Sequence, residues 1–289
     1  MSTHAKQEDA RRRLEERYQR LEESRSRRPL TAIIDRFKEI DGTTQGGLIS
    51  IELFTTVIPL IILGFGYFTG FAASASPGIL LIRELGLQSP LSDRVREAFG
   101  TSAGLASSWS IIGVAGFLVW GIPMTMTIAG MFAMAWRRNN FGLGQRVWRG
   151  AAWFFLYLAM LGFRERIAFS GDHPNAMRVL LFIVALVPVW IFWSVTPALL
   201  IRDGGSGWKY LAVAGLAGTL IDGTIIPIAA RVVFPPLLRG WDAFGPIGVA
   251  MALMTWCGVI SFGWVATACV GAILWERTAP ADTVIGSQR

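Results

Sequence analysis

The stretch Tyr210-Leu-Ala-Val-Ala-Gly-Leu-Ala-Gly-Thr-Leu-Ile-Asp222-Gly-Thr-Ile-Ile-Pro-Ile-Ala-Ala230 decides the fold. A helix rises roughly 1.5 Å per residue, so this run would cover about 30 Å, the thickness of a hydrocarbon core. Asp222 would lie near the bilayer midplane, where an ionised side chain is expensive and faces protein or water. Small residues, which close packing between membrane helices requires, surround the acid: Ala214, Gly215, Gly218, Thr219 and Gly223. The stretch therefore predicts a membrane helix whose acid faces a helix bundle.

The composition of the whole chain agrees with a membrane class. Of 289 residues, 53% are hydrophobic and only 16% are charged, and the chain carries 12 Trp and 18 Phe. The net charge is +7, but 11 of the 27 Lys and Arg lie in residues 1–48 together with 9 acids. This mixed head does not resemble a uniformly basic nucleic-acid surface, so nucleic acid is not an expected partner.

We predict an all-α polytopic membrane protein with six transmembrane helices. The predicted spans are about 48–73, 109–136, 147–163, 179–201, 210–230 and 244–275. The third has a short apolar core, so it either crosses fully or is re-entrant. Pro235 and Pro236 are expected to stop the fifth helix, and a surface helix is expected at about 80–99 in an outer loop.

The remaining segments are predicted to lie on the cytoplasmic side. Residues 1–28 form a charged amphipathic helix that is solvated or lies on the membrane surface, with a short coiled coil as the alternative, and residues 29–47 form an interfacial elbow helix and a flexible turn. In the elbow, an apolar stripe that includes Leu30 and Ile34 opposes a polar face that includes Arg36. The Lys and Arg distribution places the N-terminus inside, and six spans return the tail, 277–289, to the cytoplasm.

Two groups of residues are candidates for function. A substrate or ion pathway is predicted at Asp222, Glu52, Thr55, Thr56 and Thr219, while contact with anionic lipid headgroups is predicted at Arg137, Arg138, Arg146 and Arg149. The structural alternatives are an acid that only locks the bundle, threonines bonded to their own helix, and arginines that set topology. With His4 and His173 the only histidines, we expect no metal site, no cofactor and no enzyme active site.

Two stretches resemble the YihY/BrkB family of bacterial inner-membrane proteins. The first is Gly47-Leu-Ile-Ser-Ile-Glu-Leu-Phe-Thr-Thr-Val-Ile-Pro59-Leu60, and the second is Phe244-Gly-Pro-Ile-Gly248 followed by Trp256 and Gly271-Ala-Ile-Leu-Trp-Glu276. Departures from the family pattern are Ile273, where the family has an acid, and Glu52, where it is usually apolar. The resemblance covers roughly residues 30–280.

The resemblance implies a multi-pass protein of the bacterial plasma membrane concerned with envelope integrity. Our hypothesis is transport or handling of an envelope lipid or amphipathic solute through a polar cavity near Asp222. The alternative is a non-transporting scaffold that docks a partner membrane protein, or a second copy, through its N-terminal helix. The family was once labelled a ribonuclease, but no set of residues in this chain supports that chemistry.

Overall fold

The computed structural model describes residues 3–67, 89, 92–93, 96, 116–168, 175–241 and 244–286, and helices are the only regular structure among them. The chain divides into two compact units. Unit 1 comprises Met1–Gly42, Ala129–Thr219 and Val265–Arg289, and unit 2 comprises Thr43–Ile128 and Leu220–Trp264.

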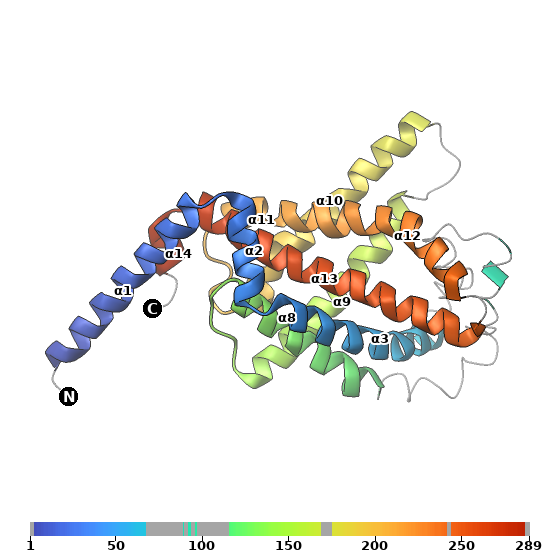
Figure 1. Ribbon diagram of the computed structural model, residues 1–289, viewed down its shortest axis with the longest axis horizontal. Coiled ribbons are helices and arrows are strands. Elements are labelled where there is room, and N and C mark those ends of the chain that lie inside the picture. The colour runs from blue at the N-terminus through green and yellow to red at the C-terminus, as the bar shows by residue number, and fades with distance from the viewer. Residues whose placement is uncertain are drawn as a thin grey trace. The chain divides into compact units, whose positions relative to one another are not determined.

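The described helices are coloured in chain order in Figure 1. Their bounds are α1 Thr3–Ser26, α2 Pro29–Glu39, α3 Gly42–Tyr67, the π-helix η2 Phe117–Gly121, α8 Ile122–Ala135, α9 Leu143–Ala168, α10 Asn175–Leu200, α11 Trp208–Leu220, the π-helix η3 Ile221–Ile225, α12 Ile226–Trp241, α13 Pro246–Thr278 and α14 Ala281–Gly286. The all-α prediction is confirmed for the described part of the chain.

Within the described part of the chain, four helical runs are long and apolar enough to cross a membrane: Leu118–Ala135, Val179–Leu200, Trp208–Trp241 and Ile247–Thr278. They correspond to the second, fourth, fifth and sixth predicted spans. The first predicted span coincides with α3 as far as Tyr67, and the third lies within α9. The count of six and the cytoplasmic side of both termini stay predictions. The loop helix predicted at about 80–99 lies largely outside the described residues.

The predicted flexible turn between the elbow helix and the first span is instead helical. Helix α3 begins at Gly42, and the chain turns at Asp41, whose φ is 50°. Within unit 2, a Cβ added at Gly46 would lie 2.7 Å from the ring of Phe262, so the helix approaches α13 closely there. This contact explains why a glycine-containing segment continues as helix.

The prediction that Pro235 and Pro236 end the fifth helix is wrong. The run continues through both prolines to Trp241 as α12. Packing within unit 2 holds this end of the helix, because the buried side chains of Phe234 and Leu238 belong to one apolar cluster with Trp256 of α13. Prolines are tolerated in apolar helices where neighbouring elements support the backbone.

Aromatic side chains form the packed centre of unit 1 between α9 and α10. Trp153 of α9 stacks on Tyr157 at 5.8 Å between ring centroids and contacts the ring of Phe192 at 5.6 Å. Its indole N–H donates to Thr196 Oγ1 at 3.1 Å, so the one polar atom of this buried ring is satisfied. Helix α9 is continuous over 26 residues, longer than the predicted segment 147–163.

The small residues of α11 allow α10 to approach closely in unit 1. A Cβ added at Gly218 would lie 2.0 Å from the Trp193 ring, and one at Gly215 would lie 2.1 Å from Ser194 Oγ. Nearby, Trp190 Nε1 donates to the carbonyl oxygen of Ala212 at 2.8 Å. The small residues thus serve the close helix packing that their pattern indicates.

Candidate functional site

Asp222 lies in the π-helical turn η3, inside the continuous helical run Trp208–Trp241. The backbone N–H of Ile226 bonds to the carbonyl of Ile221, the i to i+5 pattern of a π turn. A physical cause is Pro227, which has no N–H to offer the carbonyl of Gly223 four residues earlier. Single π turns within α-helices occur frequently at functional sites, so this distortion favours a functional role for Asp222.

The carboxyl group of Asp222 is buried, with 4% of the residue exposed. Trp264 of α13, itself buried, donates its indole N–H to Asp222 Oδ1 at 3.4 Å, and both residues make further interactions. The two helices meet closely here, because a Cβ added at Gly263 would lie 2.5 Å from Ile226 Cδ1. Asp222 therefore lies in a tightly packed part of unit 2, which agrees with the structural alternative of an acid that locks the bundle. It also lies on a distorted turn, which favours a functional role.

Glu52 is the second acid within unit 2. Its Oε1 accepts a hydrogen bond from Thr127 Oγ1 of α8 at 2.9 Å. Its Oε2 is buried and has no hydrogen-bond partner among the described residues. A buried carboxyl oxygen in this state is suited to holding a proton or meeting a cation.

The predicted pathway threonines bond to their own helices. Thr55 Oγ1 donates to the carbonyl of Ile51 at 3.0 Å, and Thr56 Oγ1 donates to that of Glu52 at 2.6 Å. Thr219, which lies in unit 1, donates to the carbonyl of Gly215 at 3.1 Å. This is the geometry of the structural alternative, whereas Thr127, which was not among the pathway residues, is the hydroxyl that reaches Glu52.

The four predicted headgroup arginines all contact other parts of unit 1. Arg138 donates to the carbonyl of Val284 at 2.7 Å and lies over the Trp275 ring. Arg149 lies over the Phe141 ring and donates at 3.2 Å to the carbonyl of Ala198 near the end of α10. Arg146 packs against Gly130, where an added Cβ would lie 2.8 Å from Arg146 Nη2, and Arg137 binds Glu39. Headgroup contact stays a prediction for all four.

Sequence reasoning missed a charged cluster that joins the N-terminal helices to the end of α13. Arg36, expected on a polar face, is 2% exposed, while Leu30 and Ile34 of the predicted apolar stripe are exposed. Arg36 Nη2 donates to both carboxyl oxygens of Glu276, at 2.8 and 3.0 Å, and its Nη1 donates to the carbonyl of Ala135. A buried guanidinium needs such partners, and Glu276 supplies them from a position 240 residues away.

Around this ion pair, an arginine from each of the two helix ends donates hydrogen bonds to carbonyl groups of the other. Arg25 of α1 donates to the carbonyls of Glu276 and Ala279, while Arg277 of α13 donates to those of Ser24 and Arg27. Each arginine thus satisfies carbonyl groups that the end of the other helix leaves without α-helical partners. These hydrogen bonds hold the end of α1 to the end of α13, and α14 packs against α1 (Figure 1).

Glu39 and Arg137 form the outer part of the same cluster. Arg137 Nε and Nη2 donate to the two oxygens of Glu39 at 2.9 and 2.5 Å. Burial alone would raise the pKa of Glu39, but the hydrogen bond and charge of Arg137, with the charge of Arg36, hold that pKa below its ordinary value. Burial would lower the pKa of Arg137, and the bond and charge of Glu39 outweigh it, so that pKa is raised.

The described part of the chain is all-helical, and its four long apolar runs are those of a membrane protein. No family model, curated protein or solved structure matches the chain. Among the described residues, no group of three His, Cys, Asp or Glu side chains is placed to hold a metal ion.

Proposed function

We propose that this chain is a bacterial inner-membrane protein that transports or handles an envelope lipid or amphipathic solute, with Asp222 as its central polar residue. The observation that carries the proposal is a buried carboxyl group on a π turn within an apolar helical run. An ionisable residue inside a membrane segment is expensive to keep and typically belongs to a substrate or ion pathway. The resemblance to the YihY/BrkB family and six spans with both termini inside are parts of this proposal.

The chemistry of the two acids suits a ligand that carries a positive charge or hydrogen-bond donors. Asp222 accepts a bond from Trp264, whose indole is a donor only, and Glu52 has a buried oxygen without a partner among the described residues. Either carboxyl group can take up a proton, a cation or a donor of a lipid headgroup. Glu52 would serve as a second acceptor within unit 2.

The proposal can be tested with purified protein in liposomes that contain a headgroup-labelled fluorescent phospholipid. Movement between leaflets is followed by quenching the outer leaflet with a membrane-impermeant reductant. Asp222→Asn keeps the shape of the side chain and removes its charge, while Asp203→Asn makes the same change at an exposed turn. We expect Asp222→Asn to lower the rate by about tenfold or more, the effect of losing one charge-assisted bond, and Asp203→Asn to leave it unchanged.

Two results would contradict the proposal. Wild-type protein that moves the labelled lipid no faster than protein-free liposomes would remove lipid movement as its activity. Equal rates in wild type and Asp222→Asn would remove Asp222 from the pathway. Unfolding measured on the same samples shows whether any loss of rate reflects loss of structure.

The exposed side chains and the anchored end of α1 favour the scaffold alternative. Its residues up to Arg20 include exposed Tyr18 and Glu16, whereas Leu21 is buried and Ser24 donates to Glu276. Exposed side chains thus precede an anchored helix end, which makes α1 a suitable docking element for a partner membrane protein or a second copy. Deleting residues 2–19 leaves the anchor in place. Loss of function with unchanged lipid movement and stability would support the scaffold.

A further inference from the structure

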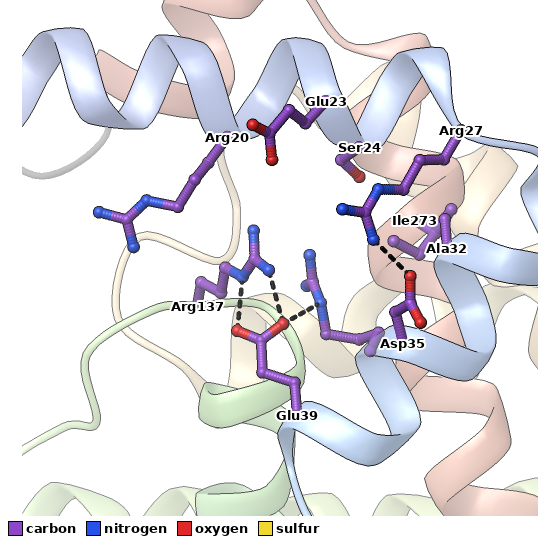
Figure 2. A pocket seen from close by; sticks show the side chains of 10 residues that line it. Arg20, Glu23, Ser24, Arg27, Ala32, Asp35, Glu39, Arg137 and Ile273 are labelled. Atoms are coloured by element: carbon purple, nitrogen blue, oxygen red, sulfur yellow. Dashed lines mark hydrogen bonds and ion pairs between the residues drawn. The ribbon is translucent and has the colours of Figure 1, made fainter.

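A polar cavity of about 160 Å³ lies in unit 1, lined by residues of α1, α2 and α13 and by Arg137 after α8. Figure 2 shows its lining: the side chains of Arg20 and Arg27 come from α1, and Arg137 and Glu39 meet on the opposite side. Four of the lining residues are arginines and three are acids. A water molecule needs only about 10–15 Å³ of such volume, so the cavity has room for a larger polar group.

The cavity lies where apolar helical runs end. The run Leu118–Ala135 ends two residues before Arg137, and Ile273, which also lines the cavity, is near the end of the run Ile247–Thr278. Positions just beyond the ends of membrane helices lie at the depth of lipid headgroups. The cavity is therefore placed by sequence position at the level where phosphate groups are abundant.

The backbone at Arg137 indicates that its side chain is needed there. Its φ is 49°, in the left-handed region, and Arg138 N bonds to Ala133 O at 2.8 Å while Arg137 N bonds to Met134 O at 3.1 Å. This is the helix ending in which glycine usually occupies the left-handed position. The pair with Glu39 is half-exposed, and such pairs contribute little to stability, so it does not account for an arginine in this strained position.

The guanidinium groups that line the cavity are suited to an anion. Arg36 is already neutralised by Glu276, and Arg27 donates to Asp35 Oδ2 at 2.6 Å, but a guanidinium carries five N–H donors, so the bond to Asp35 engages only some of those of Arg27. Guanidinium is also the group best matched to the paired oxygens of a phosphate. We propose that this cavity binds the phosphate group of an anionic ligand, either an anionic phospholipid headgroup or a free phosphate, with Arg137 and Arg27 as principal contacts.

The test uses the full chain in neutral detergent and two probes. Phosphatidylglycerol, compared with phosphatidylcholine, is counted as bound lipid by native mass spectrometry, and inorganic phosphate is tested by the shift of the thermal unfolding midpoint at constant ionic strength. Arg137→Gly removes the guanidinium and suits the left-handed backbone. The matched control is Asp203→Gly, because Asp203 also has a positive φ, of 59°. Arg27→Gln, with exposed Arg12→Gln as its control, provides a second pair.

We expect about tenfold weaker binding in Arg137→Gly and in Arg27→Gln, with both controls binding as wild type. If the protein selectively retains phosphatidylglycerol and inorganic phosphate at about 10 mM does not displace it, the ligand is a lipid headgroup. A midpoint shift with inorganic phosphate alone identifies a free phosphate. The proposal is overturned if neither probe binds wild type, or if Arg137→Gly and Arg27→Gln bind like their controls. None of these readouts involves Asp222 or lipid movement.

Discussion

The buried ion pair between Arg36 and Glu276 gives the most direct test of how the chain ends are held. Glu276 accepts two bonds from Arg36, at 2.8 and 3.0 Å, and one from Ser24 Oγ at 3.1 Å. Glu276→Ala removes all three and leaves a guanidinium that is 2% exposed with only part of its neutralising charge. Breaking a buried pair in this way costs about 3–5 kcal/mol, and we expect about 3 because Arg36 keeps Glu39 at 3.3 Å.

The measurement is equilibrium unfolding in detergent micelles with increasing dodecyl sulfate, followed by tryptophan fluorescence. The double variant Arg36→Met with Glu276→Leu removes both charges and should recover to within about 1 kcal/mol of wild type. The control is Asp35→Ala, which breaks the exposed pair with Arg27, whose side chains are 52% and 42% exposed, and should cost no more than about 1 kcal/mol. The reasoning is refuted if Glu276→Ala costs no more than Asp35→Ala, or if the double variant is no more stable than Glu276→Ala.

Two further predictions follow from close packing and from titration. Gly218→Ala should lower the free energy of unfolding by about 1–3 kcal/mol, because the new Cβ would lie 2.0 Å from the Trp193 ring, while Gly162→Ala, which meets nothing within 4 Å, should be neutral or stabilising in the same unfolding assay. The folded-state pKa of Glu39 is below its ordinary value of 4.5, so its contribution to stability is present above about that pH and is lost as pH falls through the folded pKa. Unfolding measured from pH 7 to roughly pH 3 should therefore show a smaller acid loss in Glu39→Gln than in wild type, and equal losses would exclude the Arg137 pair as its cause.

The apolar helices could be predicted because their signal is local. A run of some twenty apolar residues is sufficient to indicate a membrane helix, and four such runs were found close to their predicted positions. The errors came where tertiary packing overrides local preference. The turn predicted before Leu48 is helix because Gly46 fits against Phe262, and α12 continues past Pro235 because Phe234 belongs to an apolar cluster.

The candidate site was predictable in part, for a related reason. Asp222 stands out because a single charge interrupts an apolar run, and the sequence alone therefore names it. Arg36 and Glu276 do not stand out, since each lies at the polar end of an amphipathic or apolar segment where charges are ordinary. Only the fold brings them within 2.8 Å of each other, and no local pattern relates residues 240 positions apart.

The π turn at Asp222 has a local cause that can be recognised in the sequence. Both π-helices among the described residues precede a proline by two positions: η2 ends at Gly121 before Pro123, and η3 ends at Ile225 before Pro227. In both, a glycine lies within the four residues before the proline, whereas the other prolines inside the described helices, Pro59, Pro188, Pro197, Pro235 and Pro236, have none there and sit in regular α-helix. Proline removes a donor and crowds the preceding turn, and glycine lets that turn widen rather than kink. The glycine and proline that follow Asp222 therefore set the distorted turn on which its carboxyl group is carried, and the distortion belongs to the same short stretch that decides the fold.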